Sequence, residues 1–275
     1  MTTTRGLLRL AISAAVLTAL STIPPISTGA AAQLPLEPLR ESGQSVTPAY
    51  EGWYHNADGT ISLLVGYFNR NLKQDVDIPV GADNRVEPGG PDRGQPTHFL
   101  TRRQWGVFTI VVPGDFPEKK LTWTLVSGGR TISVPLTLHK DYEISPYKDP
   151  ALGNTPPVVQ VAGSNTKMQG PPRGVAATMT ASVGKPLALR ASVSDDMVLD
   201  PRRPADAQKL FVSWSTFRGA GAVHFQNVKS AETTATFDAP GDYILRLQAN
   251  DVSGEGGGGF QCCWTSVLIK VSVAP

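Results

Sequence analysis

The sequence predicts an all-β protein with two β-sandwich domains, the second immunoglobulin-like, joined by a proline-rich linker. Short runs of β-branched and aromatic residues recur along the chain, with turn-forming residues between them. Glycine and proline number 27 and 23 among 275 residues, which favours short strands and turns over long helices. No window shows the 3.6-residue hydrophobic period of an amphipathic helix.

Residues 1–32 are typical of a signal peptide. Arg5 and Arg9 precede a short apolar run over residues 10–20, and three alanines before Gln33 suit a signal peptidase. The apolar run is too short to cross a membrane, although an uncleaved anchor is the alternative. We therefore expect a secreted or periplasmic protein with no membrane span after signal cleavage.

The charge balance argues against nucleic acid as a partner. Two of the 25 basic residues lie in the signal peptide, so the remaining chain carries as many basic residues as its 23 acidic ones. A nucleic-acid-binding surface would require a basic excess.

The first domain is expected over residues 49–140, after a flexible lead at 33–48. Its predicted strands are residues 50–55, 60–68, 75–80, 105–112, 121–126 and 130–138. A long loop rich in glycine and proline, residues 81–96, interrupts this series. Long loops in compact domains are often functional, but a solvated connection is the simpler interpretation.

A spacer at residues 141–172 contains six prolines that keep it extended. The strand expected at 158–161 opens the second domain, whose main body is 173–275. Seven further strands are predicted at 178–183, 187–193, 210–214, 222–226, 233–237, 243–249 and 264–273. Seven strands suit an immunoglobulin-like sandwich with Trp214 in its core and Tyr243 as a corner tyrosine.

This second domain resembles a PKD-type domain of secreted bacterial proteins. The resemblance is carried by the order and spacing of Val193-Ser-Asp-Asp, Val212-Ser-Trp-Ser, Thr233-Thr-Ala-Thr-Phe and Pro240-Gly-Asp-Tyr. It implies an immunoglobulin-like, PKD-like fold and an extracellular setting. The usual Asp-Asp-Gly turn is Asp-Asp-Met here, and a glycine-rich run at 253–264 replaces a short hairpin. The N-terminal half resembles an uncharacterised all-β module found ahead of such domains.

A candidate ligand site lies where the loop at 81–98 would meet the turn after the first strand. Its candidate residues are His55, His98, Asp83, Asp92 and Arg93. Trp264 is a second ligand-binding candidate, because the preceding glycines favour partial exposure and exposed aromatic rings bind sugars. No serine-hydrolase elbow, zinc-binding His-Glu-x-x-His motif or phosphate loop occurs, so no catalytic residue is assigned.

A second candidate site consists of carboxylates. Asp195, Asp196 and Asp200 share one predicted loop, and Asp251 and Glu255 share another. If both loops lie at one end of the sandwich, their oxygens suit calcium. The alternative is that aspartate is simply a good turn residue. No other cofactor is expected.

Cys262 and Cys263 are adjacent. Packed thiols, a disulfide between neighbours and a bridge to another chain are all open interpretations.

These observations favour a non-catalytic binding, adhesion or scaffold protein. An extracellular polysaccharide or a cell-envelope protein is the expected partner. One alternative is a metal-assisted hydrolase or lyase that uses the loop at 81–98. Another is a subunit of an extracellular assembly, docked edge to edge through the second domain.

Overall fold

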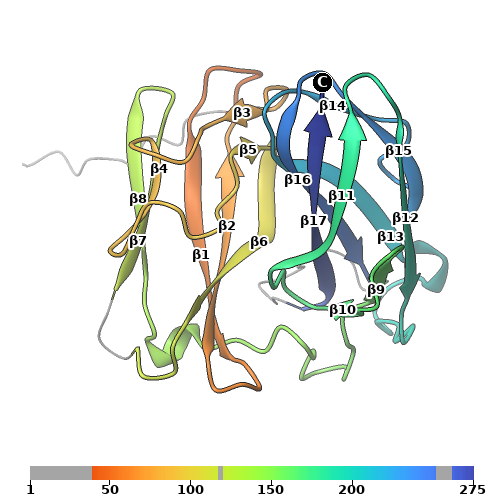
Figure 1. Ribbon diagram of the computed structural model, residues 1–275. Coiled ribbons are helices and arrows are strands. Elements are labelled where there is room, and N and C mark those ends of the chain that lie inside the picture. Colours follow the sequence, from red (N-terminus) through yellow and green to blue (C-terminus); the bar gives the residue numbers. More distant parts are fainter. Residues whose placement is uncertain (1–38, 117–119, 252–261) are drawn as a thin grey trace, which may run out of the picture. The chain divides into compact units, whose positions relative to one another are not determined.

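A computed structural model describes residues 39–116, 120–251 and 262–275 of the chain. The predicted signal peptide and Glu255 lie outside these ranges. Residues Leu39–Pro275 form one compact unit (Figure 1). In the described ranges its regular elements are strands, apart from two single-turn 3-10 helices, η1 (Lys140–Tyr142) and η2 (Ala205–Ala207). The all-β prediction is confirmed. No helix in the described ranges is long and apolar enough to cross a membrane.

The first sandwich consists of two antiparallel three-stranded sheets. One has the order β1-β2-β6, formed by Val46–His55, Ile61–Asn69 and Arg102–Val112. The other has the order β4-β7-β8, formed by Asn84–Glu87, Leu121–Ser127 and Arg130–Leu136. A small hairpin-like pair, β3 (Val76–Asp77) and β5 (His98–Phe99), stands beside them.

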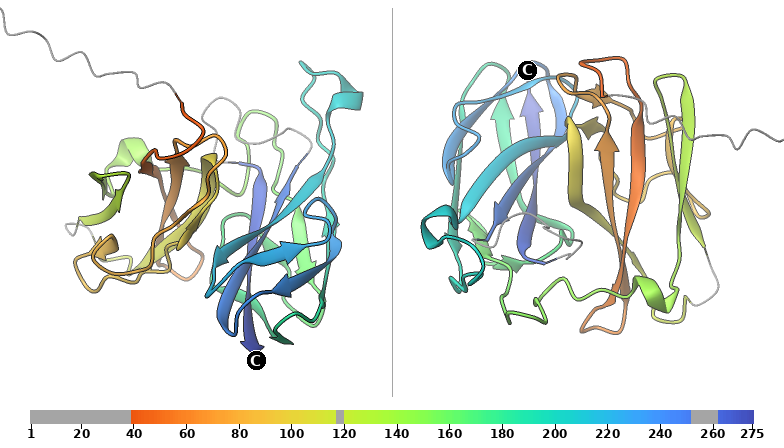
Figure 2. Two further views of the ribbon diagram at one scale, coloured as in Figure 1. Left: turned by 90° about the horizontal axis from the view of Figure 1, so that it is seen from above. Right: turned by 180° about the vertical axis from the view of Figure 1, so that it is seen from behind.

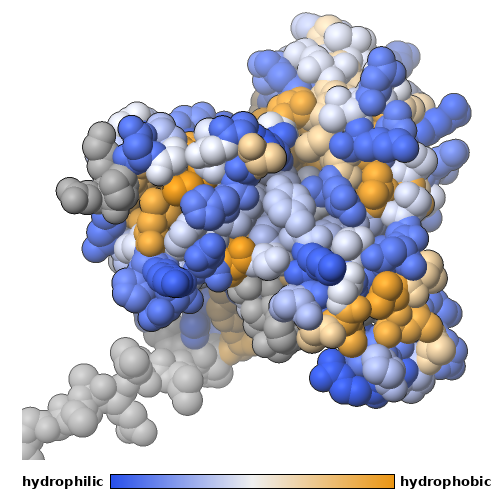
Figure 3. All heavy atoms as spheres, turned by 90° about the horizontal axis from the view of Figure 1, so that it is seen from below, coloured by the Kyte–Doolittle hydropathy of each residue, from blue (hydrophilic) through white to orange (hydrophobic). Residues whose placement is uncertain are grey.

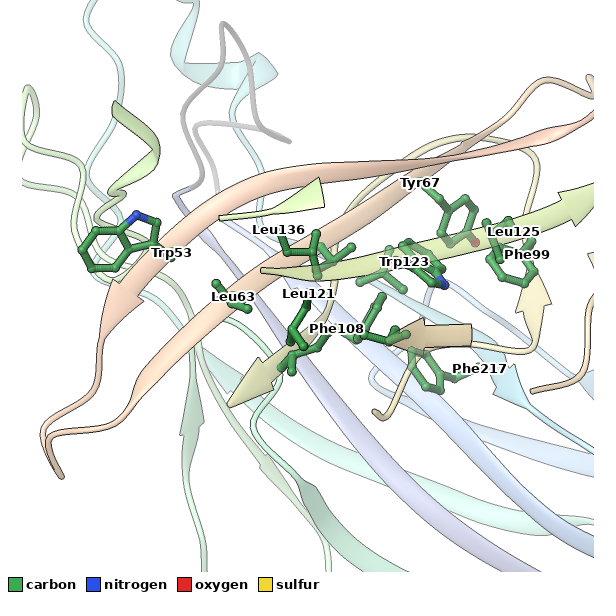
Figure 4. Close-up of a cluster of buried hydrophobic side chains, with 14 of the residues drawn as sticks. Trp53, Leu63, Tyr67, Phe99, Phe108, Leu121, Trp123, Leu125, Leu136 and Phe217 are labelled. Atoms are coloured by element: carbon green, nitrogen blue, oxygen red, sulfur yellow. The ribbon is translucent and has the colours of Figure 1, made fainter. Parts of the chain in front are cut away.

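The core of this sandwich lies between its sheets: in β7 the apolar residues Leu121, Trp123 and Leu125 alternate with threonines and are buried, and the central strand β2 is buried along nearly its whole length. Trp123 of β7 is fully buried and packs edge-on against Phe108 of β6, with ring centroids 5.0 Å apart (Figure 4). Phe217, from a strand of the second sandwich, is 2% exposed and belongs to the same cluster. The first core is therefore completed by a residue of the second sandwich.

Two segments of the first sandwich are more ordered than the sequence indicated. Strand β1 begins at Val46, inside the expected flexible lead, where the Ser127 hydroxyl accepts the Val46 N–H. The loop at 81–96 contains strand β4, which pairs with β7. Asn84 fixes this loop: its side chain donates to the carbonyls of Ile78 and Pro96 and accepts from the Trp123 indole.

The second sandwich has immunoglobulin-like strand order. One sheet is β10-β9-β12-β15-β14 and the other is β11-β17-β16-β13. Strand β11 runs parallel to β17, as the first and last strands of such folds do. The strands are β9 (Val158–Val161), β10 (Met168–Gln169), β11 (Val175–Ser182), β12 (Leu187–Ser194), β13 (Phe211–Arg218), β14 (Val223–Phe225), β15 (Glu232–Phe237), β16 (Gly241–Asn250) and β17 (Trp264–Ala274).

The two structural residues expected in this sandwich occupy their predicted positions. Trp214 is 3% exposed in the core, and its indole donates to the Ser230 carbonyl. The Tyr243 hydroxyl donates to the Ala239 carbonyl at 2.8 Å, which fixes the turn before β16. The tyrosine-corner prediction is confirmed.

The expected spacer is attached to both sandwiches. Strands β9 and β10 lie within it and belong to a sheet of the second sandwich. Its first part pairs with β1, where the Ile144 N–H donates to the Trp53 carbonyl, and the Thr109 hydroxyl donates to the Pro172 carbonyl. These bonds make the segment a fixed connection between the sandwiches.

Direct contacts also join the sandwiches, which stand side by side in both views of Figure 2. Arg218 of β13 makes a two-pronged ion pair with Asp92, at 2.8 and 3.0 Å, and donates to the Gln95 carbonyl. The Thr97 N–H donates to the Phe217 carbonyl at 3.1 Å. The long loop of the first sandwich is therefore bound to strand β13 of the second.

Candidate functional site

A cleft of about 600 Å³ lies between the β3–β5 pair and the chain from Thr216 to Val223. One wall is polar, with two carboxylates and an imidazole. The opposite wall consists mainly of glycine and alanine. The lining residues are Asp75, Asp77, Pro79, Val80, Thr97, His98, Thr216, Gly219, Ala220, Gly221, Ala222 and Val223.

His98 is the central side chain of the polar wall. Its Nδ1 lies 2.7 Å from Asp77 Oδ1, and its Nε2 lies 3.6 Å from Asp75 Oδ2. Burial alone would lower the pKa of His98, but the hydrogen bonds and charges of Asp75 and Asp77 outweigh it and raise that pKa. His98 is therefore held between two carboxylates that favour its charged form.

Sequence reasoning found His98 but missed its partners. Asp75 directly precedes β3 and Asp77 ends it, and residues two positions apart in extended chain direct their side chains to one face. That spacing is visible in the sequence. The pairing of β3 with β5, which sets Asp77 opposite His98, is not.

The other loop residues proposed for this site have different roles. Asp92 binds Arg218 and also accepts the Gly94 N–H, and this ion pair lowers the pKa of Asp92. Arg93 donates to the Pro88 carbonyl within its own loop. Asp83 is exposed, in the turn before β4. These residues hold the loop in place and are not among those that line the cleft.

His55 and His98 stand at opposite ends of the first sandwich. His55 pairs with Ile61 at one end of β2, whereas Asn69 at the other end donates to the Phe99 carbonyl (Figure 1). Eight residue steps separate those ends, about 26 Å at strand rise. His55 is exposed and packs edge-on against Trp53, with centroids 5.3 Å apart. The structure does not bring the two histidines together.

The expected exposure of Trp264 is wrong. Its side chain is 2% exposed and packs with Tyr54 and Leu64. The indole also contacts the backbone of Gly106 in β6, where the missing side chain provides the space that it fills. Trp264 is therefore part of the contact between the sandwiches and is not available as a platform for a sugar.

A buried charge network beside Trp264 was not predicted. A bulge in β1 between Tyr50 and Gly52 directs Glu51 inward, where it accepts from Arg103 and from the Gly106 N–H, both at 2.7 Å. Burial raises the pKa of Glu51, and these two donors counteract that effect. Arg246 of β16 donates to the Trp105 carbonyl beside this network. Sequence pattern could not reveal it, because bulges break the alternation of faces.

At the end of the second sandwich, Asp251 and Asn154 form a fully buried pair. The Asn154 amide donates to Asp251, and both residues are 0% exposed. Asn154 Oδ1 and Asp195 Oδ1 are buried oxygens without a hydrogen-bond partner. Burial, together with the charge of Asp251, raises the pKa of Asp195 to about 6. The charge of Asp251 thus acts on Asp195, and Asn154 adds an amide that sequence reasoning missed.

The remaining carboxylates of the expected calcium site are engaged elsewhere. Asp196 accepts the N–H and hydroxyl of Thr155, and Asp200 pairs with Arg202. Glu255 lies outside the described residues. Within those residues, no group of three or more His, Cys, Asp or Glu side chains is placed to hold a metal ion. A cation here would need amide and main-chain oxygens in addition to the two carboxylates.

Cys262 and Cys263 are joined by a disulfide between neighbours. Both are buried, and the Cys263 sulfur lies 3.5 Å from the Asn154 carbonyl oxygen. The Asp251 N–H donates to the Cys263 carbonyl at 3.2 Å. The cysteine pair therefore borders the Asn154–Asp251 pair.

No protein-family model and no curated protein matches this chain. A PKD domain solved in solution is 22% identical, covering 37% of this chain and 86% of its own, with a TM-score of 0.22. Human mucin-like protocadherin EC1-2 is 14% identical, and the match covers 84% of this chain and 99% of the protocadherin chain, with a TM-score of 0.26. Fibronectin(III)-like modules of Clostridium thermocellum CbhA are 15% identical, and the match covers 84% of this chain and 95% of the CbhA chain, with a TM-score of 0.23. At these scores the likenesses carry no argument, and the immunoglobulin-like description rests on strand order.

Proposed function

We propose that this chain is a secreted or periplasmic, non-catalytic binding protein that holds an extracellular polysaccharide in the His98 cleft. The cleft itself carries the proposal. It is the place where a fixed junction of two sandwiches presents charged side chains beside an open wall of small residues. Clefts between packed units, with few converging polar groups, are the usual form of binding sites.

The two walls suit a polyhydroxylated ligand. The carboxylates of Asp75 and Asp77 accept hydrogen bonds and are partly exposed, so hydroxyl groups can reach them. On the facing wall, Ala220 is exposed between two glycines, and its small side chain lets a sugar ring approach the backbone closely. Charge-assisted hydrogen bonds on one side and close contact on the other would orient a sugar chain.

The surroundings of His98 favour binding over metal-assisted hydrolysis. A histidine that ligates a metal offers one ring nitrogen to the ion, with the other oriented by a partner. Here Asp77 and Asp75 face both nitrogens. The PKD-type resemblance of the second sandwich and the predicted signal peptide support an extracellular setting and a structural or binding role.

Polysaccharide binding can be tested with the chain that begins at Gln33. We expect retention on at least one polysaccharide of a panel that includes cell-envelope glycans. Ala220→Trp places a bulky ring on the glycine- and alanine-rich wall and leaves Asp75, Asp77 and His98 in the sequence, so it should abolish retention, whereas Ala188→Trp on exposed β12 should preserve it. Binding only to envelope proteins, or equal binding by both variants, would contradict the proposal.

We also propose that Asp195, Asp251 and Asn154 hold calcium. The support is two unpartnered buried oxygens, on Asn154 and Asp195, beside a carboxylate that is 0% exposed. Buried oxygens without hydrogen bonds are costly unless a cation or water satisfies them, and calcium prefers such oxygen ligands. Its role would be to stabilise the fold.

A further inference from the structure

Strand β11 ends the sheet β11-β17-β16-β13, so it has a neighbour on one side alone among the described strands. It pairs with β17 in parallel, with Met179 opposite Val271 (Figure 1). An edge strand presents alternate N–H and C=O groups to its open side, and these can pair with a strand of another chain.

Natural edge strands are usually protected by charge, proline or a bulge, and β11 lacks charge and proline over its eight residues. Its register shift against β17 lies between Val175 and Ala177, at the start of the strand, and the pairing is regular from Ala177 onward. The opposite edge of the same sheet, β13, carries the charged Arg218. Strand β8 of the first sandwich carries Arg130 and Pro135. Among these strands, β11 is the one suited to accept a partner strand.

The sequence of β11 matches itself in the antiparallel direction. Residues 177–181 are Ala-Thr-Met-Thr-Ala and are symmetric about Met179. Two copies that cross at Met179 place Thr178 of one opposite Thr180 of the other, and Ala177 opposite Ala181. No like charges meet, and threonine pairs are favourable across antiparallel strands. A two-fold interface requires just such self-complementarity.

The exposure of β11 fits this pairing. Thr178 and Thr180 are exposed on the outer face. Ala177, Met179 and Ala181 are only half-buried although they pack against the core of the second sandwich. An added strand would cover the open side of these apolar residues.

We propose that the protein forms a two-fold symmetric dimer by antiparallel pairing of β11 with β11 of a second copy. Pairing merges two four-stranded sheets into one continuous sheet across the dimer. This proposal is independent of the polysaccharide site, which lies at the β3–β5 pair.

Self-association can be tested by analytical ultracentrifugation of the chain from Gln33. We expect a dimer in the wild type, and at least about tenfold weaker association for Thr180→Lys, because lysine protects an edge strand. Thr131→Lys adds the same charge on exposed β8 and should leave the dimer intact. A wild-type monomer at all concentrations, or equal effects of both substitutions, would overturn the proposal. Circular dichroism verifies that each variant is folded.

The register is tested by cross-linking. Thr178→Cys and Thr180→Cys, mixed one to one, should form a mixed disulfide dimer on a non-reducing gel, because facing Cα atoms lie within disulfide range. Each variant alone should cross-link much less, since its own copies are offset by two residues. Equal cross-linking in all three samples would reject the Met179-centred register.

Discussion

The Trp264 indole of β17 occupies the space that a side chain at position 106 would take. Gly106 has φ +51°, and a Cβ built there would overlap the indole ring. Gly106 also donates its N–H to Glu51. Gly106 therefore has two roles: its N–H binds the buried carboxylate that the β1 bulge directs inward, and its missing side chain lets the two sandwiches pack.

We predict that Gly106→Ala lowers the free energy of unfolding by about 2 kcal/mol or more, because overpacking alone costs 1–3 kcal/mol. Urea denaturation measures this. Gly184→Ala is the control, because Gly184 also has positive φ but no atom within 4 Å of a built Cβ. Equal losses in the two variants would show that backbone strain, and not contact with Trp264, is responsible.

We expect the two sandwiches to unfold together, because Phe217 of the second completes the core of the first. Phe217→Ala should cost about 3–5 kcal/mol and separate the single calorimetric transition into two. Phe211→Ala, on the same strand but 44% exposed, should change stability by less than about 0.5 kcal/mol. Two transitions in the wild type would contradict a shared core.

The stability contributed by His98 should depend on pH. Its pKa is raised in the folded state, so its charged form stabilises the protein below the unfolded-state pKa of about 6.5. This contribution is lost as pH rises through the folded-state pKa. The stability difference between wild type and His98→Gln should therefore shrink as the pH rises above about 6.5 and passes through the raised folded-state pKa.

Calcium should raise the melting temperature, and Asp195→Asn should remove that gain.

In chelator the same substitution should stabilise the protein near neutral pH. Because the pKa of Asp195 is raised to about 6, its ionised form opposes folding, and the wild type should gain stability as pH falls through 6. Asp206→Asn on η2 is the control for charge alone. Identical melting curves with calcium and with chelator would end the calcium proposal.

The sequence predicted most strands because hydrophobic alternation is a local property. Strands β12 and β17 begin where expected, at Leu187 and Trp264. It missed β4 because that strand lies in a segment rich in glycine and proline and is held by distant bonds to Asn84. The prediction that Trp264 is partly exposed was wrong, because its burial depends on the space left by Gly106, which lies 158 positions earlier in the chain. Contacts between elements, and not local pattern, decide where the sites lie.

The polysaccharide cleft is tested most directly by titrating a retained oligosaccharide into isotope-labelled protein and following backbone amide resonances. We expect the largest shifts at Thr97, His98, Ala220 and Gly221, which line opposite walls of the cleft. Largest shifts at amides remote from the cleft, or saturable binding that leaves these four resonances unmoved, would contradict the account.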